Sequence, residues 1–543
     1  MKTAFGSLLL STSAISSALA WKDQCVGFKA HSVDNIRNIT SLYYAAGSLV
    51  NLTSLYTPLS TSSLPAFCRV QFTVVTNPAT DKTAQAELWL PDGWNKRVIG
   101  YGNGGWSGGL PYTGIGPDGV AQGYASYGTD TGQYKGKSPQ SAAHASSFLS
   151  GHQSSSRNGS WGLGNDDAIV DHAYRALHLT TVASKFLTME YYGQNYTKSY
   201  YSGCSTGGRQ GLKAMTMFPE DYDGVVIGSP ANSFGRLMPW ELHQSLVMQP
   251  VNSSRWIPAA TWTAINKEVL KQCDGIDGVV DGILSDPEAC KYVHFPRHHG
   301  PNANFVPERM TCKMGYKGTD CLTLDQLETF QKLYTTYIDS EQNYVFSPYA
   351  LGGELGYGSG LSTAIPFPIA EDYYKYFVLN DTKWDWRTIN ASTIALGMKV
   401  NPGNMDVTTP DLTAFFARGG KVIQYVGWQD PLITPGNSIK WYKDVVAYTA
   451  AKSDLDVDNH FKLFTVPGMQ HCRGGPGAWI FGANAQRAQA PPLQEGPQYD
   501  VQAAMVEWLE QERSVDHIVS VKYTNDTLAQ GVAFTRKLCP FEN

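Results

Sequence analysis

The chain has 543 residues, of which 42% are hydrophobic, 12% aromatic and 16% charged, and its formal net charge is -5. This length and composition are enough to bury a large core, in one large domain or in two to three smaller ones. The weakly acidic balance lacks the basic surface that attracts nucleic acids or anionic membranes, so we expect neither as a partner.

The N-terminus has the features of a secretory signal, which we predict over residues 1–20. Lys2 gives the charged start, Leu8-Leu9-Leu10 the apolar centre, and Ala18-Leu19-Ala20 the cleavage site before Trp21. No later stretch has about 18 uninterrupted apolar residues, so no membrane span is predicted. The mature chain is therefore expected to be extracellular. Eight N-x-S/T sequons would then be open to glycosylation: Asn38, Asn51, Asn158, Asn195, Asn252, Asn380, Asn390 and Asn525.

Nine cysteines suit an oxidising compartment, where disulfides persist. Closeness in sequence predicts three short disulfides, which pair Cys25 with Cys68, Cys273 with Cys290, and Cys312 with Cys321. This leaves Cys204 with Cys472 and one odd residue, Cys539. Cys539 is then either a free thiol or a partner that displaces one of these pairings.

Three consecutive strands are predicted over residues 69–75, 84–90 and 97–101, the middle one from its alternation of apolar and polar residues. The third strand runs into the glycine-rich stretch Gly102-Asn103-Gly104-Gly105. Beside a nucleophile, the backbone amides of such a loop can hold a developing oxyanion, and Gly105 is our candidate. A plain glycine turn is the alternative.

The stretch Gly203-Cys204-Ser205-Thr206-Gly207 matches G-x-S-x-G, the nucleophile elbow, in which a serine lies on a sharp turn between a strand and a helix. Because this short pattern also occurs by chance, the flanking residues decide. Residues 199–202 are typical of a short strand, and residues 210–218 predict a helix that Pro219 ends. The context therefore favours an elbow with Ser205 as the nucleophile.

Two cysteines flank the residues that such a nucleophile needs. Cys204 precedes Ser205, and Cys472 follows His471. A disulfide between them would bring their Cα atoms within about 7 Å of each other, which would make Ser205 and His471 neighbours. This pairing is a hypothesis, since sequence alone cannot prove it.

The order of the remaining elements predicts an α/β fold with a large insertion. A helix over 165–187 and strands over 199–202 and 224–228 alternate as in a mostly parallel sheet covered by helices. Regular alternation stops near residue 232 and resumes with strands over 420–427 and 461–466 and a final helix over 501–511. We expect a signal peptide (1–20), a catalytic domain (21–235 and 405–543) and an inserted lid domain (236–404). An inserted structural module is the alternative to a lid that forms the substrate pocket.

Within the insertion, the stretch from Cys273 to Cys290 contains three carboxylates among glycines, at Asp274, Asp277 and Asp281. Such a loop suits a hard cation that binds side-chain and carbonyl oxygens, although it lacks the EF-hand spacing. A solvated acidic turn is the alternative. No Cys/His spacing resembles a zinc site.

Ser205, Asp430 and His471 follow one another in the order nucleophile, acid, base, which is the order used on the α/β-hydrolase sheet. Each follows a predicted strand, so all three are expected at one edge of the sheet. The histidine would activate the serine hydroxyl, and the carboxylate would orient the histidine. The competitors are His460 and His517 for the base, and Asp454, Asp456 and Asp458 for the acid.

These motifs resemble the tannase and feruloyl esterase family of secreted serine esterases, which is marked by a disulfide between the neighbours of the catalytic serine and histidine. The resemblance implies an α/β-hydrolase fold, a Cys204–Cys472 disulfide and Asp430 as the acid, within Gly427-Trp428-Gln429-Asp430-Pro431-Leu432. It also implies a calcium site in the lid, with side-chain oxygens from Asp274, Asp277 and Asp281 and carbonyl oxygens from Val279 and Ile283. Cys539 departs from an evenly paired pattern.

The reaction that this resemblance implies is hydrolysis of carboxylic esters of aromatic acids, with the amides of Thr206 and Gly105 around the oxyanion. We favour feruloyl esters of plant cell-wall sugars, because the lid lacks the dibasic processing site of some tannases. A tannase acting on galloyl esters is the alternative. A secreted calcium-dependent binding protein with a vestigial elbow is the alternative from another class.

Overall fold

The computed structural model describes residues 19–30, 35–132, 155–290, 292, 305–316, 318–359 and 364–542. Its main sheet has nine strands in the order β1-β4-β5-β7-β6-β8-β9-β12-β13. The pairs from β1 to β7 are antiparallel, and those from β7 to β13 are parallel. The strands are β1 (Ile36–Tyr44), β4 (Phe67–Asn77), β5 (Lys82–Pro91), β6 (Arg97–Tyr101), β7 (Ala125–Thr129), β8 (Lys198–Cys204), β9 (Gly224–Gly228), β12 (Lys421–Gly427) and β13 (Phe461–Val466).

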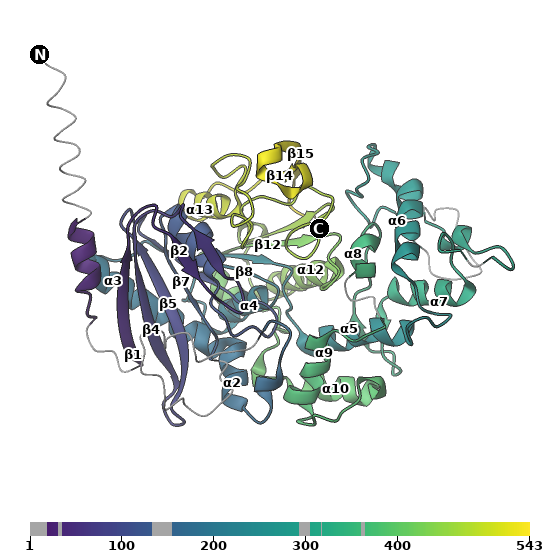
Figure 1. Cartoon of the computed structure of the whole chain (residues 1–543), viewed down its shortest axis with the longest axis horizontal. Helices are drawn as coiled ribbons and strands as arrows, with labels where there is room; N and C mark the ends of the chain where they lie inside the picture. The colour runs from purple at the N-terminus through teal and green to yellow at the C-terminus, as the bar shows by residue number, and fades with distance from the viewer. Residues whose placement is uncertain are drawn as a thin grey trace, which may run out of the picture.

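Helices and loops cover both faces of this sheet, so its central strands are buried almost throughout. Successive residues of β9 serve two cores: Val225 and Ile227 belong to one apolar cluster, and Val226 to the cluster on the opposite face. The covering helices are α2 (Asp166–Val170), α3 (Ala176–Tyr192), α4 (Thr206–Met217), α12 (Pro435–Lys452) and α13 (Val501–Gln511) (Figure 1). The protein has the predicted α/β-hydrolase fold.

The predicted strands and helices of the catalytic domain are confirmed, with longer bounds in several cases. The helix predicted over 165–187 is α2 and α3 joined by a π-helical turn, η5 (Asp171–Arg175), and it extends to Tyr192. Strands β1 and β7 were not predicted. Neither were three two-stranded sheets, β2 (Val50–Leu52) with β3 (Leu59–Thr61), β10 (Tyr337–Ile338) with β11 (Tyr344–Phe346), and β14 (Ile518–Tyr523) with β15 (Val532–Leu538).

The segment between β9 and β12 is mainly helical and forms a lobe beside the sheet (Figure 1). Its helices are α5 (Phe234–Met248), α6 (Ala259–Cys273), α7 (Leu324–Leu333), α8 (Glu354–Ser359), α9 (Pro368–Asp372), α10 (Ala391–Val400) and α11 (Thr413–Ala417). The apolar core of the lobe, which includes Trp240, Trp262 and Phe330, is continuous with buried residues outside it, such as Trp106 and Ile169. Helix α5 begins two residues before the predicted lid boundary at 236. The division into two domains stays a prediction.

All four expected disulfides are present: Cys25–Cys68, Cys204–Cys472, Cys273–Cys290 and Cys312–Cys321. Cys539 is exposed and remains a free thiol. The predicted signal peptide lies outside the described residues except for positions 19 and 20. The asparagines of all eight sequons are exposed, as an acceptor for a glycan must be. Within the described ranges, no helix is long and apolar enough to cross a membrane.

A buried ion pair joins β4 to β5 near the start of the sheet. Arg69 Nε donates to Glu87 Oε2 over 2.8 Å, and the two side chains are only 8% and 2% exposed. The Glu87 carboxylate also accepts hydrogen bonds from Gln71, Trp89 and Tyr112. These hydrogen bonds offset the free-energy cost of burying the two charges. Loss of one residue of the pair would leave the charge of the other buried and unpaired.

We therefore expect Arg69→Met to lower the free energy of unfolding by about 3 to 5 kcal/mol. The matched control is Arg37→Met, because Arg37 pairs with Asp81 at side-chain exposures of 49% and 75%. That exposed pair should contribute about 1 kcal/mol or less. Urea unfolding measures the stability of both variants. Equal losses would contradict the conclusion that the buried Arg69–Glu87 pair matters more to stability than the exposed Arg37–Asp81 pair.

Candidate active site

Ser205 lies on a strained turn between β8 and α4. Its φ is +64° and its ψ is -121°, a conformation that is rare for residues other than glycine. Ser205 N–H donates to the Gly228 carbonyl over 2.9 Å, and its own carbonyl accepts from Ala231 N–H. A Cβ atom at Gly203 would lie 2.6 Å from the backbone of Gly207, so the turn needs glycine there. The predicted nucleophile elbow is confirmed as a structural element.

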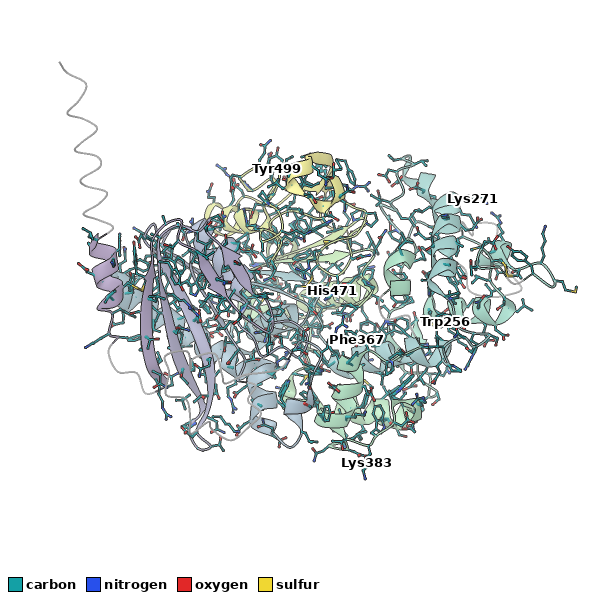
Figure 2. The ribbon with its side chains drawn as sticks, viewed as in Figure 1. Trp256, Lys271, Phe367, Lys383, His471 and Tyr499 are labelled. Atoms are coloured by element: carbon teal, nitrogen blue, oxygen red, sulfur yellow. A yellow bond between two sulfur atoms is a disulfide. The ribbon has the colours of Figure 1, made fainter. Side chains whose placement is uncertain are left out.

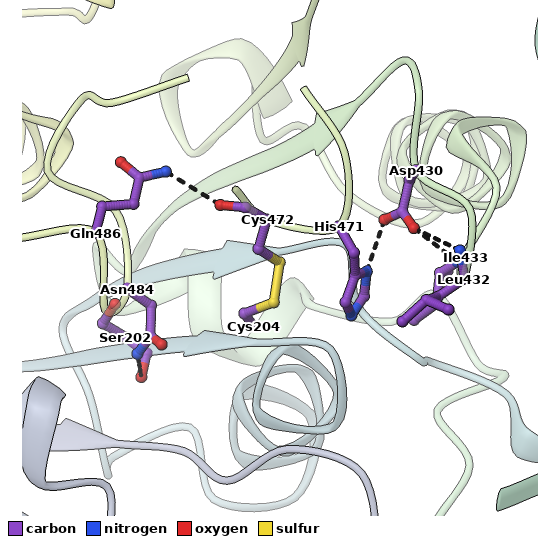
Figure 3. The surroundings of a disulfide bond; sticks show 9 residues. All are labelled: Ser202, Cys204, Asp430, Leu432, Ile433, His471, Cys472, Asn484 and Gln486. Atoms are coloured by element: carbon purple, nitrogen blue, oxygen red, sulfur yellow. Dashed lines mark hydrogen bonds and ion pairs between the residues drawn. A yellow bond between two sulfur atoms is a disulfide. The ribbon is translucent and has the colours of Figure 1, made fainter. Parts of the chain in front are cut away.

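His471 and Asp430 form a hydrogen-bonded pair above the carboxyl ends of the strands (Figure 3). His471 Nδ1 lies 2.8 Å from Asp430 Oδ2, and the Asp430 side chain is fully buried. Asp430 Oδ1 accepts hydrogen bonds of 2.9 Å from the backbone amides of Leu432 and Ile433. These three donors fix the carboxylate, which in turn fixes the orientation of the imidazole.

Three of the five competing residues have other partners. Asp456 caps the short 3-10 helix η11 (Val457–Asn459), and Asp458 pairs with Lys462. His460 hydrogen-bonds through Nδ1 to the Gly420 carbonyl. Asp430 is therefore the acid that contacts His471.

The Cys204–Cys472 disulfide connects the elbow to the loop that carries His471 (Figure 3). Its Cα atoms are 6.4 Å apart, although the two residues are 268 positions apart in sequence. A ring nitrogen of His471 lies within 4.8 Å of both sulfur atoms. Gln486 Nε2 donates to the Cys472 carbonyl over 3.1 Å and so holds the same loop from the other side.

A cavity of about 400 Å³ opens in front of these residues. Ser205 and His471 lie in its wall beside residues of the insertion, including Phe367, and Figure 2 shows His471 and Phe367 close together in the middle of the molecule. The apolar lining comes largely from the insertion and the loop after β12: Phe234, Leu237, Met238, Phe367, Ile369, Leu432 and Ile433. The site therefore combines a polar reactive edge with an apolar chamber.

The two predicted oxyanion residues also line this cavity. Thr206 is the first residue of α4, so its amide has no acceptor within the helix. Thr206 Oγ1 donates to the Gly105 carbonyl over 3.2 Å, which joins the two segments. Gly105 has a φ of +56°, and a Cβ atom there would lie 2.3 Å from the Ser156 carbonyl oxygen. Only glycine fits this position.

The acidic loop of the insertion supplies oxygen atoms of the kind that calcium prefers. Asp274 Oδ2 accepts a hydrogen bond from Gly282 N–H, whereas Asp274 Oδ1 is buried and has no hydrogen-bond partner among the described residues. Asp277 and Asp281 each accept a backbone amide, from Val279 and Ile283 respectively. The donor chemistry fits a hard cation.

Asp281 Oδ2 pairs with Arg536 of β15, a contact that sequence reasoning missed. In the part of the chain that the structure describes, the one convergent group of three or more potential metal ligands is Cys204, His471 and Cys472. Its sulfur atoms are bonded to each other and are not available as thiolates. The three aspartates are thus not gathered around one point.

Sequence reasoning also missed one face of α5. Phe234, Leu237, Met238 and Glu241 all line the cavity. Their spacing of three, four and seven positions places them on one stripe of a helix, so the pattern was available in the sequence. The insertion broke the regular alternation there, and no helix was predicted.

An α/β-hydrolase sheet, a serine on an elbow and a histidine–aspartate pair at the same cavity define the class of serine-type ester hydrolases. Comparison with known proteins narrows this class. The family model described as "Tannase and feruloyl esterase" matches residues 68–353 and 352–543. The chain belongs to the tannase and feruloyl esterase family, and it is a carboxylic ester hydrolase.

Individual relatives agree with this assignment. The chain is 34% identical over 475 residues to a probable feruloyl esterase B-2 of Aspergillus flavus, a match that covers 87% of this chain and 83% of the relative. It is 31% identical to a probable feruloyl esterase B-2 of Aspergillus oryzae, over 98% of this chain and 94% of the relative. The crystal structure of feruloyl esterase B from Aspergillus oryzae superposes with a TM-score of 0.82 at 30% identity and covers 96% of each chain.

The disulfide generates a prediction about the geometry of the site. The double variant Cys204→Ala, Cys472→Ala should lower kcat/KM for an aryl ester by on the order of 100-fold or more, because small displacements of a catalytic group have effects of that size. Closing so long a loop also contributes up to about 5 kcal/mol in the chain-entropy model, so the unfolding midpoint should fall as well.

The control is the double variant Cys312→Ala, Cys321→Ala, which removes a disulfide that spans only 9 residues within the insertion. It should keep kcat/KM within a few-fold of the wild type. If both double variants lost activity equally, or neither did, the Cys204–Cys472 bond would have no specific role in the site.

Proposed function

We propose that this protein is a secreted serine esterase that hydrolyses feruloyl and related hydroxycinnamoyl esters of plant cell-wall polysaccharides. The main support is that Ser205 and His471, which is hydrogen-bonded to Asp430, line the same apolar cavity. The names of the relatives, feruloyl esterase B, support this substrate class over others in the family. The signal-like residues 1–20 and the four disulfides support secretion.

The proposed reaction begins with attack of Ser205 Oγ on the ester carbonyl carbon. His471 accepts the serine proton through Nε2 and returns it to the leaving alcohol, while Asp430 stabilises the imidazolium. The amides of Thr206 and Gly105 hold the oxyanion. A water molecule, activated by His471 in the same way, then attacks the acyl-enzyme and releases the aromatic acid.

The apolar chamber supports an aromatic acyl group as the part of the substrate that binds inside it. Phe234, Leu237 and Phe367 offer contacts to a ring and its propenoyl chain, whereas the sugar would remain outside. A tannase, which cleaves galloyl esters, is the second candidate, because the same family model describes both activities. Rates on methyl ferulate, methyl caffeate and methyl gallate, measured side by side, distinguish them.

We expect Ser205→Ala to lower kcat for methyl ferulate by more than about 10,000-fold, since the nucleophile is removed. Ser205 is only half-buried, and its side chain makes no capping hydrogen bond to α4, so the unfolding midpoint should hardly change. Hydrolysis is followed by the absorbance of released ferulate. A variant that kept its rate would exclude Ser205, and a wild type inert on every aromatic ester would favour a binding protein.

The acidic loop is proposed to hold a structural calcium ion through Asp274, Asp277 and Asp281, with the carbonyls of Val279 and Ile283. Binding of the ion would bring the three carboxylates around one point, replace the Asp281–Arg536 contact and order the loop closed by Cys273–Cys290. Calcium at 100 times its dissociation constant should stabilise the chelator-treated protein by about 2.7 kcal/mol.

Thermal unfolding with and without calcium measures this effect. Asp274→Asn should abolish the shift, because it replaces the buried carboxylate whose Oδ1 lacks a partner. The control is Asp286→Asn, an exposed aspartate of the same loop whose side chain accepts a hydrogen bond from the Glu288 amide. A calcium shift that persists in Asp274→Asn, or one lost equally in both variants, would count against the proposed ligands.

A further inference from the structure

One carboxyl group in the wall of the cavity is not used by the chemistry described above. Glu241 lies on α5 and is only 2% exposed, and its Oε2 has no hydrogen-bond partner among the described residues. The other cavity-lining residues of α5, Phe234, Leu237 and Met238, are apolar. A single polar side chain therefore stands on an otherwise apolar stripe that faces the substrate chamber.

Glu354, another fully buried carboxyl group of the insertion, has the hydrogen-bond partners that Glu241 lacks in the described part of the chain. Glu354 accepts hydrogen bonds from Asn266, from Tyr334 and from the Gly352 amide. An unpaired polar group in the interior is costly, so natural proteins rarely retain one without a use. For Glu241, a partner that enters the cavity would supply the missing hydrogen bond.

The protonation state of Glu241 suits a neutral partner. Burial, and then the negative charge of Asp430, raise its pKa well above the ordinary glutamate value. The protonated acid has one O–H donor and an acceptor oxygen. A phenolic hydroxyl also donates and accepts, so the two groups can exchange hydrogen bonds without burying a net charge.

We propose that Glu241 is the specificity-determining residue for the acyl half of the substrate, and that its carboxyl group hydrogen-bonds the hydroxyl opposite the side chain of the aromatic ring. This inference rests on the proposed esterase function. It adds to that function a requirement for a 4-hydroxylated ring, and it assigns the requirement to one side chain.

The position of Glu241 along α5 favours a long acyl group. The segment leading into α5 is anchored at the nucleophile, where Ala231 N–H donates to the Ser205 carbonyl over 3.1 Å. Glu241 lies seven residues beyond Phe234, the first residue of the helix, which is about 10 Å along its axis. A hydroxycinnamoyl group places its ring hydroxyl two carbon atoms farther from the ester carbonyl than a galloyl group does. With the ring bound along α5, the longer group reaches farther from the ester carbonyl toward Glu241.

The test compares methyl 4-hydroxycinnamate with methyl cinnamate, which differ only in the ring hydroxyl. The wild type should show a higher kcat/KM for the hydroxylated ester by on the order of 10- to 100-fold, the effect of leaving a buried polar group unpaired. Glu241→Met, which keeps the length of the side chain and removes its polar atoms, should reduce this preference to within about two- to threefold. Glu241→Gln stays neutral, retains a donor and an acceptor, and should keep most of the preference.

The control is Met238→Leu, one turn earlier on the same stripe, which should change the rates on both esters by the same factor. Unfolding midpoints are measured for all variants, and Glu241→Leu replaces Glu241→Met if the latter does not fold. Equal wild-type rates on the two esters, or a preference that survives in the apolar variant, would overturn the role of Glu241 and leave the esterase assignment intact. A wild type inactive on both esters would instead overturn the proposed function, and this inference with it.

Discussion

The covalent bond between Cys204 and Cys472 is the constraint on which the rest of the site depends. Strands β8 and β13 are separated in the sheet by β9 and β12. Three inter-strand spacings amount to about 14 Å, so the loop after β13 must reach back across two strands to meet the elbow. The first part of this loop is held beside β12, where Gln429 N–H donates to the Met469 carbonyl over 3.0 Å. The disulfide, with the hydrogen bond from Gln486 to the Cys472 carbonyl, fixes the next part of the loop to the elbow.

Residues of the insertion line the cavity beside Ser205 and His471. Helix α5 begins beside the nucleophile and contributes one stripe of residues to the cavity, while Phe367 and Ile369 close the chamber from another segment of the same lobe. In the proposed function, residues on the sheet carry out the chemistry, and residues of the lobe shape the cavity. Relatives that share the sheet and the disulfide can differ in substrate through substitutions on such a stripe.

The elbow at Ser205, the main parallel strands and the short disulfides could be predicted from local sequence. Glycine turns, apolar periodicity and closely spaced cysteines are each visible within a short stretch of residues. The order of Ser205, Asp430 and His471 located the triad candidates through the topology of the sheet. Contacts between distant residues cannot be predicted from local sequence, as the Arg536–Asp281 contact shows, because it joins positions 255 residues apart. Strand β7 could not be predicted, because its short sequence of mostly small and polar residues is also typical of a loop. Glu241 could not be singled out, because only the structure shows that it lines the cavity.

The most direct test of the central claim labels the native protein with a fluorophosphonate, which reacts with activated serines, and then maps the peptides without reduction. The structure predicts one labelled species, in which the peptide with modified Ser205 is joined through Cys204 to the peptide that contains His471 and Cys472. Label on another serine, or recovery of these two peptides as separate chains, would contradict the account.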